Sequence, residues 1–215
     1  HDALQMTHAL TVPNGPPILL PEPCISTRLE SACHPITGCS TAFSNFSDDP
    51  QWLSSCFGSD DDWTRGKVWE GGEILARELL ARPYLVHGLR VVECGAGTGI
   101  VGLAAAAAGA KDVTMTDASL DAAEASVRVN PSLASRISLR PLRWGDAAAS
   151  AALAPPFDLV LAADVVHPQN AAALDPLLES MRSLAGVAGA TRAPFALLSY
   201  IERSTELTER LDASL

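Results

Sequence analysis

The sequence has little positive charge and no long apolar run. Of its 215 residues, 15 are Lys or Arg and 25 are Asp or Glu, which gives a net charge of −10. Only two are lysines, Lys67 and Lys111. Because proteins that bind nucleic-acid phosphates or anionic membranes need clustered cations, this balance argues against both functions. No apolar run approaches the roughly 18 residues that a membrane-spanning helix needs, so we expect no such helix.

The cysteine pattern gives no sign of a disulfide framework or of a common metal site. There are five cysteines, an odd number, and no Cys-x-x-Cys pair. The spacing of Cys33, His34 and Cys39 does not match the usual zinc sites, so we expect reduced thiols and no metal. The sequence also lacks a signal peptide, which favours the cytoplasm or the nucleus.

A change of composition divides the chain near residue 65. Residues 1–66 contain eight acidic and two basic residues, and segments such as 13–17 are rich in Pro, which favours loops and extended chain. We therefore expect residues 1–65 to form an acidic, partly ordered extension. Its aromatic residues, Trp52 and Trp63 among them, are candidates to anchor it to a core.

Residues 66–215 alternate short apolar runs with amphipathic or Ala-rich stretches, which is the pattern of a parallel α/β sheet. The periodicity predicts strands at 89–94, 112–116, 137–142, 157–163 and 194–200. It predicts helices at 71–82, 100–108, 119–129, 171–184 and 204–211, with Ser119 as the N-cap of the third. Right-handed crossovers then give a doubly wound, mostly parallel Rossmann-like α/β fold.

A glycine-rich segment follows the first predicted strand, where open α/β sheets usually bind ligands. Gly97-x-Gly99-x-x-Gly102 matches the dinucleotide fingerprint, which binds a pyrophosphate. Glu93-x-Gly95-x-Gly97-x-Gly99 matches the acidic glycine loop of S-adenosylmethionine (SAM) enzymes. Since a carboxylate repels pyrophosphate and attracts the ammonium and sulfonium of SAM, Glu93 favours SAM.

Three residues at the ends of the next two strands are candidates to bind a nucleoside. Asp117 closes the second strand, where a carboxylate can accept hydrogen bonds from ribose hydroxyls of either NAD or SAM. Trp144 and Asp146 follow the third strand, where an indole offers a surface for adenine and a carboxylate can accept from its amino group. Packing and helix capping are the alternative roles of these residues.

The apolar fourth strand ends in Asp164 and is followed by His167. A carboxylate that leaves such a strand at the cofactor edge is suited to orient an amine. Methyl transfer to an amine needs the amine held in line, deprotonated and out of water. His167 is a candidate to accept the proton, with a loop histidine of no chemical role as the alternative.

These segments together resemble the seven-β-strand protein-lysine methyltransferases, known as methyltransferase family 16. The resemblance covers about 135 residues, from Val68 to Arg203. It rests on the segments 66–72, 92–99, 116–117 with Asn130, 142–146, 157–167 and 200–203, in that order.

The resemblance implies a class I methyltransferase fold and SAM-dependent methylation of a protein side-chain amine, usually lysine, with S-adenosylhomocysteine as product. It implies that Asp164 is the acid on the substrate side. The candidate cofactor contacts are Trp69, Glu93, Gly95, Gly97, Thr98, Gly99, Asp117, Trp144 and Ala163. His167 stands where the family has Tyr or Phe, which leaves the type of the target residue open.

Two other functions remain alternatives: an NAD-type oxidoreductase, and a non-catalytic binding module on the methyltransferase fold. A class I core has two further strands after 204–211, so we expect them to be missing from 66–215 or to come from the extension. The acidic balance favours a basic protein partner, and we expect a monomer.

Overall fold

The computed structural model describes residues 6–10, 18–21, 66–185 and 195–214. The Cys33, His34 and Cys39 group and the aromatic residues of 22–65 lie outside the described residues. Within the described part, no helix has the length and apolarity that a membrane crossing requires.

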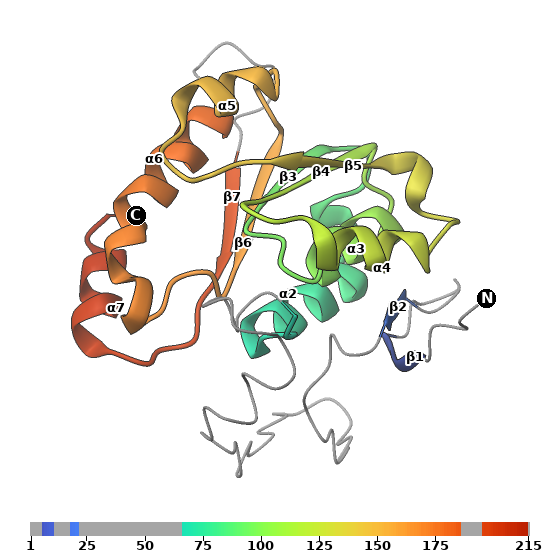
Figure 1. Cartoon of the computed structure of the whole chain (residues 1–215), viewed down its shortest axis with the longest axis horizontal. Helices are drawn as coiled ribbons and strands as arrows, with labels where there is room; N and C mark the ends of the chain where they lie inside the picture. The colour runs from blue at the N-terminus through green and yellow to red at the C-terminus, as the bar shows by residue number, and fades with distance from the viewer. Residues whose placement is uncertain (1–5, 11–17, 22–65, 186–194, 215) are drawn as a thin grey trace.

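A five-stranded parallel sheet forms the centre of the fold (Figure 1). Its strands are β3 (Arg90–Cys94), β4 (Asp112–Asp117), β5 (Ile137–Pro141), β6 (Leu159–Ala163) and β7 (Phe195–Ser199). The strand order is β5-β4-β3-β6-β7, so the chain winds outward from β3 in one direction and then returns to β6 on its other side. The predicted doubly wound fold and its five strands are confirmed.

Helices cover both faces of the sheet (Figure 1). The predicted helices correspond to α2 (Glu70–Ala81), α3 (Ile100–Ala107), α4 (Asp121–Arg128), α6 (Leu174–Ala185) and α7 (Thr205–Asp212). The sequence analysis missed α5 (Ala147–Ala152) and the 3-10 turns η1 (Pro83–Leu85), η2 (Ala134–Arg136) and η3 (Pro168–Ala173). Turn η3 replaces the first turn predicted for α6.

The prediction that Ser119 is the N-cap of the helix at 119–129 is wrong. Helix α4 begins at Asp121 with Leu120 as its N-cap, and the Ser119 hydroxyl contacts the Asp121 carboxylate instead. The Ser119 amide is drawn back to the carboxylate of Asp117, which extends the turn after β4 by two residues. By contrast, Ser204 caps α7 through the amide of Leu207.

The remaining strands, β1 (Met6–Leu10) and β2 (Ile18–Pro21), pair antiparallel in a sheet of their own. Strand β2 lies against α3 and α4. The expectation that the extension supplies edge strands to the main sheet is therefore wrong for these two strands.

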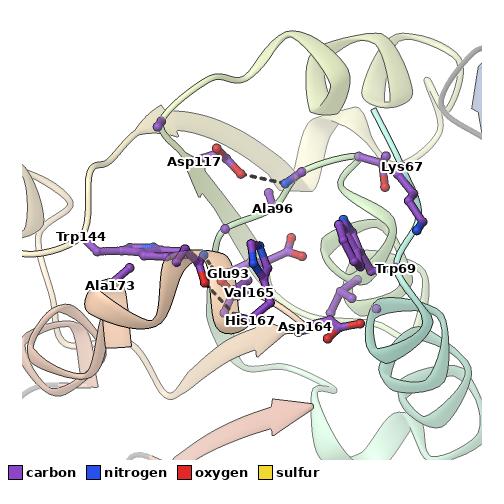
Figure 2. A pocket seen from close by; sticks show the side chains of 18 of the residues that line it. Lys67, Trp69, Glu93, Ala96, Asp117, Trp144, Asp164, Val165, His167 and Ala173 are labelled. Carbon is purple, nitrogen blue, oxygen red and sulfur yellow. Dashed lines mark hydrogen bonds between the residues drawn. The ribbon is translucent and has the colours of Figure 1, made fainter. Parts of the chain in front are cut away.

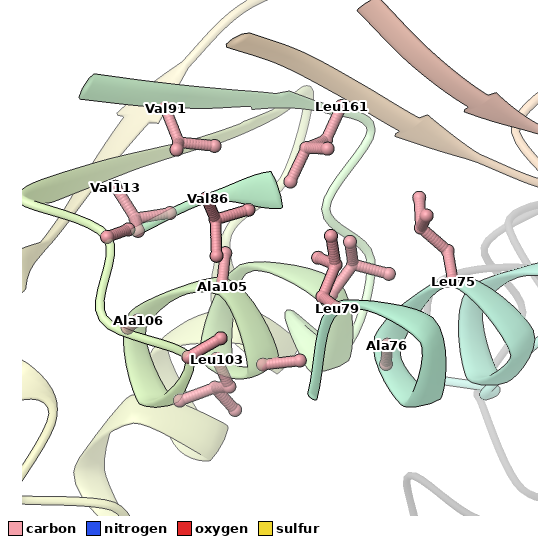
Figure 3. Close-up of a cluster of buried hydrophobic side chains, with 14 of the residues drawn as sticks. Leu75, Ala76, Leu79, Val86, Val91, Leu103, Ala105, Ala106, Val113 and Leu161 are labelled. Atoms are coloured by element: carbon pink, nitrogen blue, oxygen red, sulfur yellow. The ribbon is translucent and has the colours of Figure 1, made fainter. Parts of the chain in front are cut away.

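Two hydrophobic cores enclose the sheet. One lies between the sheet and α2 and α3, and Figure 3 shows Leu75, Leu79, Val91, Leu103 and Leu161 in it. The other lies under α6 and α7. The alanines 104–106 are completely buried, which lets α3 approach the strands closely. These cores fix the carboxyl ends of β3 and β6 at the point where the strand order reverses.

Gly102 sets the distance between α3 and the sheet. A Cβ at this position would lie 2.5 Å from Cε of Met115 and 2.6 Å from Oε2 of Glu93. Alanine therefore overpacks the interface between helix and sheet, although it is the better helix former.

We predict that Gly102→Ala lowers the free energy of unfolding by about 1–3 kcal/mol, as overpacked cores typically do. Urea denaturation followed by circular dichroism measures the change. Gly72→Ala in α2 is the matched control, because its Cβ would meet only ordinary contacts at 3.7 Å. Equal stability of the two variants would contradict the packing argument.

Candidate functional site

A cavity of about 630 Å³ opens at the carboxyl ends of the strands, between the glycine loop and the residues that follow β6. It lies beside the switch between β3 and β6, where open α/β sheets bind ligands. Figure 2 shows Trp144 on one side and Trp69 with Asp164 on the other. Its size is within the usual range for small-molecule sites.

Nearly all of the predicted site residues line this cavity. They are Trp69, Glu93, Gly95, Gly97, Thr98, Asp117, Trp144, Ala163, Asp164 and His167. Gly99 does not line it: it is the N-cap of α3 at φ 79°, and a Cβ there would face Met115 and Ala123. Asp146 caps α5 by accepting from the amide of Ala149, which leaves no support for the predicted contact with adenine.

The glycine loop turns through backbone conformations that suit glycine. Gly95 and Gly97 have φ of 76° and 52°. A Cβ at Gly95 would lie 2.6 Å from Cγ1 of Val165 and 3.0 Å from Trp144, whereas at Gly97 nothing lies within 4 Å. Gly95 thus lets Trp144 and the loop after β6 approach, and Gly97 leaves space beside the loop.

The Asp117 carboxylate holds the loop in place (Figure 2). Its Oδ2 accepts a hydrogen bond from the amide of Gly97 at 2.8 Å, and its Oδ1 accepts from the amide of Ser119 at 3.2 Å. A carboxylate has about four acceptor positions, so this half-buried group retains capacity for further donors.

Glu93 lies beneath the loop. It is almost completely buried, and its Oε2 accepts from the amide of Gly102 at 3.0 Å. Burial, with a smaller contribution from Asp117, raises the pKa of Glu93 to about 8. Burial thus favours the protonated carboxyl, whereas a cation beside it would favour the carboxylate. The interpretation of Glu93 as a contact for a cationic cofactor stays a prediction.

Cys94, the next residue, offers no nucleophile. Burial raises the pKa of its thiol to about 12, so that the thiolate is scarce at neutral pH.

Asp164 lies at the end of β6 at φ 53°. Its side chain is completely buried and forms an ion pair with Arg203, with Nη1–Oδ1 at 2.5 Å and Nη2–Oδ2 at 2.9 Å. Its Oδ2 also accepts from the amide of Gly71 at 3.2 Å. Three of its acceptor positions are thus occupied by groups of the protein.

An aromatic pair stands beside Asp164. The rings of Trp69 and His167 stack with centroids 5.7 Å apart and planes 13° apart. His167 Nδ1 lies 3.1 Å from Oε1 of Gln169. The Lys67 ammonium lies 4.3 Å and the Arg203 guanidinium 5.4 Å from the Trp69 ring centroid.

The sequence analysis did not single out several residues of the site. Lys67, Val165, Gln169 and Asn170 line the cavity, and Arg203 binds Asp164. One signal pointed to a partner for Asp164, since a carboxylate that follows a buried strand needs a nearby cation or several donors. Arg203 closes the segment 200–203 that resembles the family, but no feature of the sequence paired it with Asp164.

Comparison with known families identifies the chain. A family model described as lysine methyltransferase matches residues 60–209. The chain belongs to this lysine methyltransferase family. The resemblance found in the sequence motifs is thereby confirmed, and the methyltransferase interpretation of the glycine loop is favoured over the dinucleotide one.

Individual relatives agree. The chain is 36% identical over 104 residues to protein N-lysine methyltransferase METTL21A of Mus musculus, covering 46% of this chain and 47% of that protein. It is 34% identical over 125 residues to EEF1A lysine methyltransferase 3 of Mus musculus, covering 57% and 52%. The chain spans about half the length of these curated relatives.

Solved structures of methyltransferases are also similar. A ribosomal protein L11 methylase from Lactobacillus delbrueckii subsp. bulgaricus is 24% identical with a TM-score of 0.37, covering 54% of this chain and 52% of that one.

The pKa of Glu93 predicts a pH dependence of stability. Because the folded state holds this proton up to about pH 8 while an unfolded Glu, whose ordinary pKa is 4.5, loses it near that pH, stability falls as the pH rises between these values. We predict that Glu93→Gln, which keeps an acceptor for the amide of Gly102, flattens this fall. Urea midpoints at several pH values across that window measure the effect.

Glu179→Gln on α6, at an exposed position, is the control and should follow the wild-type profile. Parallel pH profiles for wild type and Glu93→Gln would contradict the assignment.

Proposed function

We propose that the protein is a SAM-dependent N-methyltransferase that acts on a side-chain amine of another protein, most suitably lysine. The observation that carries the proposal is the match to the lysine methyltransferase family across a cavity that the glycine loop, Asp117 and Asp164 line. The names of the relatives support the same activity.

The residues present fit SAM. The space beside Gly97 admits a ligand close to the backbone, and the remaining acceptor capacity of Asp117 suits ribose hydroxyls. Trp144, which lines the cavity, offers a face for the adenine ring. Trp69, Glu93, Gly95, Thr98 and Ala163 complete the proposed set of contacts. When bound, SAM supplies an electrophilic methyl group on a positively charged sulfur.

On the acceptor side, the chain has to hold an amine, remove its proton and exclude water. We propose that His167 accepts the proton that the amine loses. Its Nδ1 lies 3.1 Å from Oε1 of Gln169, and its side chain also accepts from the backbone amide of Asn170, so the ring is held in place on the loop after β6. The stack with Trp69 keeps the ring at the cavity wall, and we assign the Asp164 carboxylate beside it, which Arg203 holds in place, to the acceptor side.

The acidic composition of the chain supports a basic protein partner. The cytoplasm or the nucleus remains the proposed compartment. Residues 1–65 as a separate extension and a monomeric state also remain proposals.

Incubation of the protein with tritiated SAM and cell-extract proteins, followed by mass spectrometry of the labelled products, tests the activity. Methylated lysine in a defined extract protein supports the proposal. SAM binding in calorimetry without transfer to any extract would instead favour a non-catalytic binding module, and NAD binding without SAM binding would favour an oxidoreductase.

We predict that Asp117→Ala weakens S-adenosylhomocysteine binding by about 1–3 kcal/mol, because hydroxyl acceptors and the anchor of the Gly97 amide are both lost. Isothermal titration calorimetry measures the change. Asp121→Ala, an exposed carboxylate four residues away, is the matched control and should bind as the wild type does. Unchanged affinity in Asp117→Ala would refute this assignment.

The family has Tyr or Phe at this position, so His167→Phe tests whether this chain relies on a base that its relatives lack. We predict that the variant lowers the rate of methyl transfer by about 100-fold, the lower end of the range for proton transfer by a side chain. The phenyl ring retains the stacking surface for Trp69 but has no basic nitrogen. Tritium incorporation measures the rate, and calorimetry with S-adenosylhomocysteine verifies that the cavity is intact. A variant as fast as the wild type would show that His167 serves only as a wall.

A further inference from the structure

Arg203 links three separate elements at the acceptor side of the cavity. It follows β7 by four residues, contacts both carboxylate oxygens of Asp164 at the end of β6, and lies over Trp69 at the start of α2. The guanidinium is 28% exposed, whereas the Asp164 side chain is 0% exposed. In this ion pair Arg203 therefore lies on the side of the solvent, and Asp164 lies inside, out of its reach.

Helix α2 depends on this pair for its N-terminal cap. Its N-cap residue is Trp69, which makes no side-chain capping hydrogen bond. The amide of Gly71 lies in the first turn, where helix amides have no partner within the helix, and it donates to Oδ2 of Asp164 instead. The carboxylate therefore caps α2 from another strand, and its charge complements the helix dipole.

The contact leaves no room for adjustment. A Cβ at Gly71 would lie 2.9 Å from Cβ of Asp164 and 3.1 Å from Oγ of Ser199. The amide of Asp164 donates to the carbonyl of Ser199 at 2.8 Å, which ties β6 to the end of β7. A displacement of the Asp164 side chain would therefore be transmitted to Gly71 and, two residues earlier, to Trp69.

A buried carboxylate that loses its cation is strongly destabilised and has to move, take up a proton or admit water. Each of these responses would weaken the bond to the Gly71 amide and shift the Trp69 and His167 stack. Arg203 itself does not line the cavity, so any effect on the reaction has to act through Asp164 and Trp69.

On the basis of the proposed function, we propose that Arg203 is a positioning residue of the acceptor side. It fixes the Asp164 carboxylate with a two-pronged contact, and the carboxylate in turn fixes the start of α2 and thus the Trp69 wall beside His167. A lysine would preserve the charge but not the planar two-pronged contact.

The experiment compares the wild-type chain with Arg203→Ala, Arg203→Lys and the control Arg210→Ala. Arg210 lies on α7 and forms an exposed ion pair with Asp175 at 3.6 Å. Hydrogen exchange followed by mass spectrometry reports on residues 66–75 without any substrate. Tritium transfer from labelled SAM to extract protein reports on the reaction.

In Arg203→Ala we expect exchange in 66–75 to become roughly tenfold faster, the factor that corresponds to one lost hydrogen bond to a charged group. We expect transfer to fall by about 100-fold, as a misplaced acceptor site would cause. Added guanidinium ion, at concentrations that do not denature the protein, should partly restore both the slow exchange in 66–75 and the rate of transfer. Arg203→Lys should lie between wild type and Arg203→Ala, and Arg210→Ala should match the wild type.

Unchanged exchange in 66–75, or faster exchange with undiminished transfer, would overturn the proposal. The proposal would also be overturned if exchange became faster and transfer slower but guanidinium restored neither. That result would indicate general destabilisation. If Arg203→Ala does not fold, exchange in 66–75 and methyl transfer measured on Arg203→Lys test the proposal instead. If the wild type transfers no label, the proposed methyltransferase activity fails, and the exchange measurements still decide whether Arg203 controls the start of α2.

Discussion

The acceptor side of the cavity depends on one buried carboxylate that serves two elements at once. Asp164 caps the first turn of α2 through Gly71 and is held by Arg203 from the segment after β7. Neither contact is local in sequence, and each requires the strands β6 and β7 to be in register, as their pairing from Leu159 to Ala163 shows. The site is therefore a consequence of the completed sheet, and we expect it to be absent from any partly folded form in which β7 has not yet paired.

The cofactor side is built on a different principle, which is close approach of backbone. Gly102 brings α3 onto Met115, Gly95 lets Trp144 and Val165 reach the loop, and Asp117 holds the amide of Gly97. None of these contacts is an ion pair, and two of the four, Gly102 with Met115 and Gly97 with Asp117, lie within the single unit β3-α3-β4. This half of the cavity can thus be specified by a short sequence motif, whereas the other half requires residues from three distant segments.

That difference explains what could be predicted from the sequence. The strands and the glycine loop were predictable because apolar runs and glycines act locally, and Asp117 and Asp164 were found because each directly follows a strand. Helix α5 was missed because its alanines show no amphipathic period, and the cap at Ser119 failed because Asp117 holds the turn open. The partner of Asp164 and the burial of Glu93 depend on three-dimensional packing, so composition and spacing could not reveal either.

The electrostatics of the cavity follow from the same packing and differ from the formal charges. Burial shifts Glu93 toward its protonated form, and Arg203 compensates Asp164, so the lining is less negative than its three carboxyl groups suggest. Lys67 and Arg143 also line the cavity. The interior is therefore not strongly negative, although the chain carries −10. If the proposed basic protein partner is attracted by charge, the attraction therefore comes from acidic residues on the outer surface, and the proposed cofactor is selected by the shape of the cavity, by its aromatic walls and by the acceptors of Asp117.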